Sequence, residues 1–197
     1  SYFTEFWPSD NTDPIERLFI QWGFSQVFPA KTMCAHVTTW NKNSSVKFRT
    51  DVAMMCKLGF DIKLADMSKD DETYCRTAVQ NYNRLKPVVL EGDMYRLISP
   101  YGSNHTSTMY VGKDKDKAVV FAFDIHPRYA EKTLPVRLQG LDADKMYRVK
   151  EINLMPGANS SLSGNGEVFS GEFLMNVGLN LFTTQQLNSR VVEVVAE

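Results

Sequence analysis

The chain has 197 residues, a length that allows one or two domains with a sizeable core. Hydrophobic residues make up 43% and charged residues 23%, proportions that are ordinary for a globular protein. The formal net charge of -1 gives no electrostatic argument for nucleic acid or an anionic membrane as a partner, whereas a neutral ligand is compatible with it. No apolar run reaches the roughly 18 residues that a transmembrane helix needs.

The first predicted unit is a strand, a polar turn and a helix. Residues 2–7 are rich in aromatic side chains and are followed by a proline, as expected of a buried strand. Asp13 is a good N-cap, with Pro14 at the first helical position and Glu16 completing a capping box. A helix is therefore predicted over residues 14–28.

The pattern of this helix predicts one apolar face. That face contains Ile15, Leu18, Phe19 and Trp22. Arg17 and Gln21 fall off it and are expected to face solvent.

Asp10 lies on the loop between the strand and the helix. In α/β folds such loops lie at the carboxyl end of the sheet, where ligands bind. The sequence allows two interpretations of this residue. It is either a turn former whose side chain bonds the local backbone, or a catalytic carboxyl beside the aromatic wall of Trp7.

Two further strand and helix units follow. Residues 32–37 form a short apolar run typical of a buried parallel strand, and apolar residues then recur at helical spacing over residues 46–58. Residues 60–64 alternate as a third strand, after which Ser68 opens a helix that Pro87 is expected to end. Three such units in succession predict a parallel sheet with crossover helices.

The second half of the chain has a different sequence pattern, in which short β-rich runs are separated by turn signals. The predicted strands are residues 94–99, 107–111, 117–123, 134–138, 147–152, 171–176 and 190–195. This spacing predicts an antiparallel β-sandwich, with a domain boundary near residues 88–93.

Several motifs resemble those of α-galactosidases of glycoside hydrolase family 36. The first is Trp-Pro-Ser-Asp-Asn-Thr-Asp at residues 7–13, followed by Ile-Glu-Arg-Leu and Gln-Trp-Gly. Met-Cys-Ala-His-Val-Thr at residues 33–38, Leu-Gly-Phe-Asp at 58–61 and Gly-Asp-Met-Tyr-Arg-Leu at 92–97 continue in the family's order. The resemblance covers the whole chain and is strongest to about Pro100. Pro8 departs from the threonine that is usual in the family.

The resemblance implies a fold that combines α/β and all-β parts. Residues 1–90 would be the last three βα units of a (β/α)8 TIM barrel, and residues 91–197 a C-terminal antiparallel β-sandwich domain. The chain would then be a C-terminal portion of a melibiase, with further residues upstream.

The resemblance also implies an activity, namely retaining hydrolysis that releases terminal α-linked galactose from oligosaccharides such as raffinose or melibiose. Asp10 matches the general acid/base. Trp7 matches the aromatic residue beside it and would be either a wall for galactose or a core residue beneath the barrel rim. The family's nucleophile lies in a Lys-Trp-Asp motif that this sequence lacks, so the chain alone is expected to have no appreciable hydrolase activity.

Other functions stay open at this point. The same family includes α-N-acetylgalactosaminidases and galactosyltransferases, and a non-catalytic carbohydrate-binding or assembly module is the alternative from another class. Open strand edges in three barrel units favour association into a homo-oligomer. Neither nucleic acid nor a membrane is expected as a partner, and a bacterial cytoplasm or periplasm is compatible with the sequence.

No cofactor and no metal site is expected. The three cysteines, Cys34, Cys56 and Cys75, fall in apolar segments without ligand spacing, which is typical of buried structural thiols. His36 lies within an apolar strand, where a hydrogen-bonded core histidine is the default. Trp40 is predicted to be a surface aromatic that could extend a sugar subsite.

Overall fold

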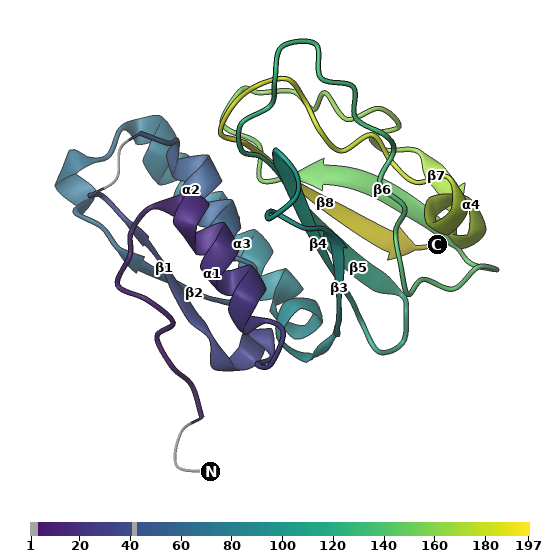
Figure 1. The fold of residues 1–197 in the computed structure, drawn as a ribbon, viewed down its shortest axis with the longest axis horizontal. Helices are drawn as coiled ribbons and strands as arrows, with labels where there is room; N and C mark the ends of the chain where they lie inside the picture. Colours follow the sequence, from purple (N-terminus) through teal and green to yellow (C-terminus); the bar gives the residue numbers. More distant parts are fainter. Residues whose placement is uncertain (1–3, 41–42) are drawn as a thin grey trace.

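The computed structural model describes residues 4–40 and 43–197, which form a small parallel sheet, a layer of helices and a larger antiparallel sheet (Figure 1). The main helices are α1 (Pro14–Phe24), α2 (Val46–Ala53), α3 (Lys69–Glu91) and α4 (Gly171–Asn176). The strands are β1 (Cys34–Thr38), β2 (Lys57–Asp61), β3 (Asp93–Ile98), β4 (His105–Val111), β5 (Lys117–Asp124), β6 (Met146–Ile152), β7 (Val168–Ser170) and β8 (Asn188–Ala196).

The parallel part contains the three strand positions that the sequence predicts. β1 pairs with β2 in parallel, from Cys34 opposite Lys57 to Thr38 opposite Asp61. Phe6 adds an isolated parallel bridge to Met33, with its carbonyl accepting from the amide of Cys34 at 2.9 Å. The first predicted strand is thus represented by one bridge, and residues 1–3 lie outside the described residues. The third strand begins at Lys57, three residues earlier than predicted.

The antiparallel sheet has six strands in the order β3-β4-β5-β8-β6-β7. Its central strand β5 is buried on both faces, and its side chains alternate between two cores. Val119, Phe121 and Phe123 pack against the helix layer, whereas Val120 and Ala122 pack into a second cluster on the opposite face. The first of these clusters contains residues from both sides of the predicted domain boundary.

That opposite face is covered by irregular segments and by α4. The segments are joined by an isolated bridge between Val136 and Leu179. The prediction of a strand at residues 134–138 is therefore wrong, because this stretch forms a bridge at one residue and is otherwise irregular. The prediction of a strand at 171–176 is wrong, because these residues form α4. Ser170 caps this helix by accepting from the amide of Phe173 at 3.1 Å, and a Cβ on Gly171 would lie 1.9 Å from the Asp142 carbonyl oxygen.

Two predictions about the other helices are also corrected. α3 continues through Pro87 to Glu91, because Val88 and Val89 beyond the proline are buried in the core. In α1, Arg17 and Gln21 are only 3% and 4% exposed, although the apolar pattern places them on the solvent side. The helix ends at Phe24.

A buried aspartate connects the helix layer to the antiparallel sheet. Asp51 of α2 is fully buried and accepts from Lys47 Nζ at 2.5 Å, Tyr74 Oη at 2.9 Å, Ser189 Oγ at 2.7 Å and Asn153 Nδ2 at 3.1 Å. Tyr74 belongs to α3 and Ser189 to β8, so the single carboxylate of Asp51 links α2 to both α3 and β8. A buried charge is tolerated only with such partners.

We expect Asp51→Ala to lower the free energy of unfolding by about 3–5 kcal/mol, because it leaves the Lys47 ammonium buried without its counter-ion. Urea unfolding followed by circular dichroism measures this loss. Asp144→Ala is the matched control at an exposed aspartate and should change stability by no more than about 0.5 kcal/mol. Equal effects of the two substitutions would contradict the role given to Asp51.

Candidate active site

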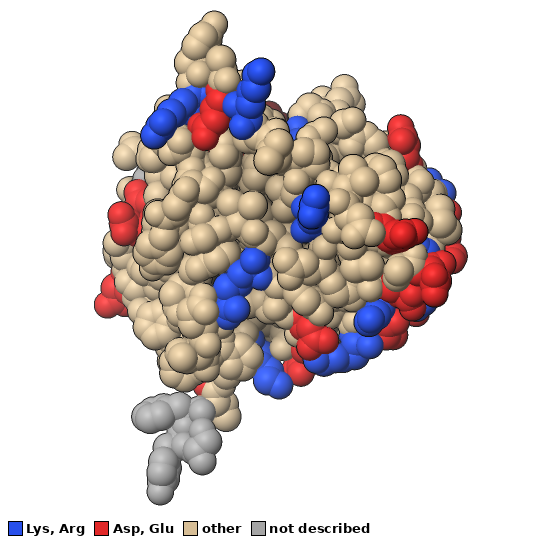
Figure 2. Space-filling view, turned by 45° about the vertical axis from the view of Figure 1, so that its right-hand side comes forward, with Lys and Arg blue, Asp and Glu red and all other residues tan. Residues whose placement is uncertain are grey.

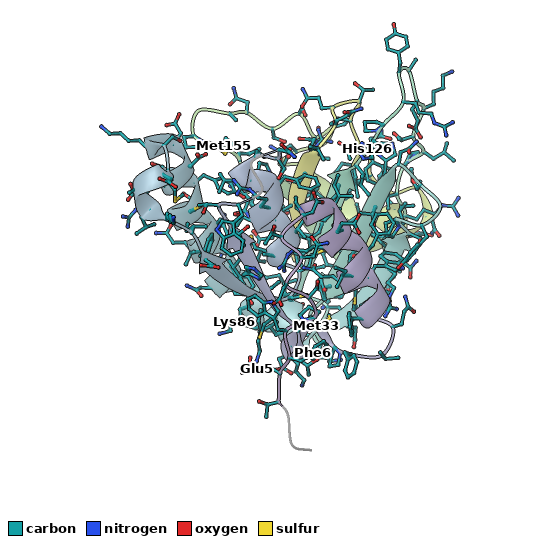
Figure 3. The ribbon with its side chains drawn as sticks, turned by 60° about the vertical axis from the view of Figure 1, so that its left-hand side comes forward. Glu5, Phe6, Met33, Lys86, His126 and Met155 are labelled. Carbon is teal, nitrogen blue, oxygen red and sulfur yellow. The ribbon has the colours of Figure 1, made fainter. Side chains whose placement is uncertain are left out.

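The carboxyl ends of the parallel strands define one edge of the molecule. Thr38 ends β1 and Asp61 ends β2, and the loop bearing Asp10 follows the bridge residue Phe6 in the same direction. Figure 3 shows Phe6 and Met33 together at the end where these strands begin, with His126 and Met155 at the opposite end. Polar side chains at this edge are in the position where α/β proteins carry their chemistry.

The Asp10 loop is built by local hydrogen bonds. Ser9 Oγ accepts from the amide of Asn11 at 3.0 Å, and Asn11 Oδ1 accepts from the amide of Asp13 at 2.8 Å. Asp13 in turn caps α1 by accepting from the amides of Ile15 and Glu16, which confirms the predicted N-cap. Asn11 thus takes the place that a capping box gives to Glu16.

The Asp10 carboxylate is exposed, and no described residue forms a hydrogen bond or ion pair with it. Its neighbours within the loop bond the backbone instead. Asp10 is therefore exposed on a loop that hydrogen bonds of Ser9, Asn11 and Asp13 hold in shape.

Trp7 stacks on His36. The two ring centroids are 4.1 Å apart and the ring planes are inclined by 28°. Trp7 is 49% exposed and His36 only 8% exposed, so the histidine lies beneath the indole. About half of the Trp7 surface is therefore accessible in the part of the chain that the structure describes.

Arg17 reaches this cluster from the first turn of α1. Its Nη2 donates to the carbonyl oxygen of Ser9 at 3.3 Å and lies 3.0 Å from Nδ1 and 3.2 Å from Nε2 of His36. Arg17 is almost fully buried, and burial lowers the pKa of its guanidinium. Since arginine has only donors and keeps its charge in proteins, the histidine nitrogen that it meets must act as an acceptor.

The surroundings of His36 favour its neutral form. Burial, and next the positive charge of Arg17, lower the pKa of His36 from 6.5 to about 4, against the opposing influence of Asp61 and Asp10. His36 is therefore the buried, hydrogen-bonded histidine that the sequence predicts, uncharged near neutral pH.

A cavity of about 270 Å³ lies at the same edge of the parallel sheet, beside the ends of β1 and β2. It is lined by residues that follow β1 and β2 and by the first turn of α2, among them Thr39, Ser44, Arg49, Ile62 and Asp66. Asp10 lies outside this lining. Trp40 directly follows Thr39 and is 74% exposed, in agreement with its prediction as a surface aromatic.

The cysteines are structural. Cys56 and Cys75 are buried, and burial raises the pKa of their thiols to about 12 and about 11. Cys34 is partly buried, and burial together with the hydrogen bond to Glu5 raises its thiol pKa. Thiols of this kind are poor nucleophiles and poor metal ligands at neutral pH.

Neither a metal cluster nor a membrane span is found in the part of the chain that the structure describes. Among the described residues no group of three or more His, Cys, Asp or Glu side chains could hold a metal ion. Within residues 4–40 and 43–197 no helix is long and apolar enough to cross a bilayer. On the face in Figure 2, basic and acidic side chains are intermixed and leave large uncharged areas.

The structure places Arg17 and His36 against the loop that carries the two residues selected from the sequence, Asp10 and Trp7. Trp7 was predicted to end a strand, and it lies in this loop after the single bridge of Phe6. Arg17 was missed because its helical position indicates solvent. The Ile-Glu-Arg string was available as a sign that Arg17 has a specific role.

Two family models match the chain. Residues 1–92 match the melibiase model, and residues 105–194 match the model of the glycosyl hydrolase family 36 C-terminal domain.

Similar proteins are α-galactosidases. α-Galactosidase 2 of Hypocrea jecorina is 35% identical over 197 residues, which cover 97% of this chain and 24% of that protein. α-Galactosidase 1 of Pediococcus pentosaceus is 30% identical over 182 residues, which cover 90% of this chain and 23% of that protein. The chain thus spans about a quarter of the length of the curated relatives it matches.

Solved structures of the same class superpose on the whole chain. The family 36 α-galactosidase AgaB of Geobacillus stearothermophilus gives a TM-score of 0.86 at 28% identity, covering 100% of this chain and 26% of that one. An α-galactosidase of the same organism in complex with raffinose gives 0.83 at 27% identity, covering 96% and 25%.

The strand and helix units and the attached antiparallel sheet therefore both match parts of melibiase-class proteins. The chain belongs to glycoside hydrolase family 36.

The lowered pKa of His36 predicts a pH-dependent stability. Between pH 6.5 and about 4 the unfolded chain binds a proton at this residue and the folded chain does not, so stability is complete above pH 6.5 and falls as the pH drops. By pH 5 the loss amounts to about 2 kcal/mol.

Urea unfolding at pH 8 and pH 5 measures this dependence. His36→Gln, which cannot be protonated, should remove about that part of the difference between the two pH values. His126→Gln changes an exposed histidine and should leave the difference intact. Parallel pH curves for the wild type and His36→Gln would show that His36 is not the group responsible.

Proposed function

We propose that this chain serves as part of a retaining α-galactosidase, which releases terminal α-linked galactose from oligosaccharides. The observation that carries the proposal is Asp10, an exposed carboxylate that shares with Trp7 the loop at the carboxyl edge of the parallel strands. Relatives that match the chain are named α-galactosidases, and solved structures of similar proteins hold raffinose and stachyose.

In this reaction Asp10 acts as the general acid/base. Retaining enzymes place two carboxyl groups about 5–5.5 Å apart on either side of the glycosidic bond. One attacks the anomeric carbon, and the other protonates the leaving oxygen and then deprotonates the incoming water. An exposed carboxyl with no intramolecular partner suits the second role, because both the leaving group and water must reach it.

Trp7 provides the surface for the sugar ring. One face of its indole is covered by His36, and about half of the side chain stays accessible. The C–H face of a pyranose packs on an aromatic ring of this kind, while the neutral His36 beneath adds no charge that would attract an ionic ligand.

The family assignment supports a finer description of the fold. The Phe6 bridge, β1 and β2 with helices α1 to α3 correspond to the last three βα units of a (β/α)8 barrel, and residues 91–197 to the C-terminal β-sandwich. The nucleophile of the pair belongs to a strand outside this sequence, which has no Lys-Trp-Asp motif.

Asp10→Asn tests the acid/base role in a polypeptide that contains this chain and the rest of the catalytic domain. We expect kcat/KM on melibiose to fall by about 10²–10⁴, and to fall much less on a dinitrophenyl α-galactoside, whose leaving group needs no proton. Asp13→Asn, in the same loop, keeps an N-cap and should leave both values nearly unchanged. Equal activities of the two variants would contradict the proposal.

The 197-residue chain by itself should be inactive on a nitrophenyl α-galactoside. The reason is that it supplies only one carboxyl of the reacting pair. Release of nitrophenol, measured by absorbance, should equal that of the Asp10→Asn chain. Turnover near that of a complete enzyme would show that the second carboxyl lies within this sequence.

A further inference from the structure

We propose that Arg17 and His36 form a positioning pair that holds the Asp10 loop at the edge of the sheet. Neither residue is assigned to the chemistry above, and the inference deepens the proposed function by naming what places its acid/base. The pair acts through contacts on both sides of Asp10. Ser9 precedes Asp10 directly, and Trp7 lies at the start of the same loop.

The first contact is made to the loop backbone. Arg17 Nη2 donates to the carbonyl oxygen of Ser9 at 3.3 Å. This carbonyl belongs to the peptide group that links Ser9 to Asp10, so its direction fixes the orientation of the Asp10 backbone. The guanidinium comes from the rigid first part of α1, which Asp13 caps.

The second contact fixes the guanidinium itself. The same Nη2 lies 3.0 Å from His36 Nδ1, and His36 belongs to β1, which is paired along its length with β2. A long arginine side chain has many rotamers, and a buried acceptor on a strand selects one of them. The guanidinium of Arg17 is thus held by a contact to the sheet as well as by its own helix.

The third contact returns to the loop through the aromatic stack. Trp7 lies on the His36 ring at a centroid distance of 4.1 Å. His36 therefore meets both Trp7 and the side chain that bonds Ser9, and the loop is attached at two points to one buried ring. Neither Arg17 nor His36 forms a hydrogen bond or ion pair with the Asp10 carboxylate, which is left for the substrate.

The arrangement requires a neutral His36. A protonated imidazole has donors on both nitrogens and would face the donors and the positive charge of Arg17. The low pKa of His36 agrees with this requirement. Both side chains are buried, so water cannot separate the two charges that a protonated His36 would bring together. Of the carboxylates near the pair, that of Asp10 raises the pKa of both side chains and that of Asp61 raises the pKa of His36.

Arg17→Met and His36→Phe test the pair. Met keeps the unbranched stem of the side chain without the guanidinium donors, and Phe keeps a ring beneath Trp7 without a nitrogen. In the 197-residue chain, each variant should shift the backbone amide resonances of Asp10 and Asn11 and raise their hydrogen exchange at least tenfold. The double variant should do no more than the more severe single variant, because the two side chains act as one unit.

Gln21→Met is the matched control. Gln21 lies one turn further along α1 and is as buried as Arg17, and its amide has no bond to the Asp10 loop. This variant should alter stability without moving the Asp10 and Asn11 resonances. If Arg17→Met does not fold, Arg17→Lys replaces it, and the shorter, single-headed ammonium should loosen the loop partially.

Kinetics in a polypeptide that contains the rest of the catalytic domain give the second readout. A positioning role predicts a 10- to 100-fold lower kcat with little change in KM for Arg17→Met and His36→Phe, and an unchanged kcat for Gln21→Met. Loop resonances that stay fixed in Arg17→Met, or that move equally in Gln21→Met, would overturn the inference. If the loop loosens but no galactosidase activity exists even in the wild type, the pair stands and the proposed function fails.

Discussion

The burial of the helix layer between two sheets is the constraint on which the rest of the structure depends. α2 contacts β1 and β2 on one side and β8 on the other, and Phe48 of α2 packs edge-on against Phe123 of β5 at 5.6 Å. The Tyr110 hydroxyl of β4 donates to the Met55 carbonyl at 2.7 Å, in the turn that leads into β2. The antiparallel sheet therefore positions the short parallel strands as well as covering the helices.

This dependence explains why a charged residue is kept in the middle of the layer. Apolar packing alone allows helices to slide against a sheet, whereas a fully buried carboxylate with four directed donors accepts one arrangement only. Asp51 fixes α2 against α3 and β8, and α2 lies directly against β1. The position of α2 therefore also determines where the carboxyl ends of the strands and the Asp10 loop lie.

The site follows a simple division of labour between side chains. A group with the acid/base role proposed for Asp10 must be free to meet its substrate, so it cannot also hold itself in place. Contacts on either side of Asp10 supply that placement, through the Ser9 carbonyl and the Trp7 ring. The uncharged character of the buried histidine and the intermixed surface charges are in keeping with a neutral sugar as ligand.

Local rules in the sequence determined much of this protein. Asp13 and Ser68 cap α1 and α3 as predicted, the three parallel positions occur in order, and the family motifs identified the class and directed attention to Asp10 and Trp7. These features depend on neighbours a few residues away, or on strings that can be read directly. The helix at 171–176 had such a local signal in Ser170, which was outweighed by the surrounding β pattern.

Only the tertiary structure decided which residues are buried at positions where the helical pattern predicts exposure or a helix end. Arg17 is buried because a strand nineteen residues away offers His36 as an acceptor, and α3 passes through Pro87 because the core beyond it has room for Val88 and Val89. Whether a polar or helix-breaking residue is tolerated depends on a partner distant in sequence, and helical spacing contains no information about that partner.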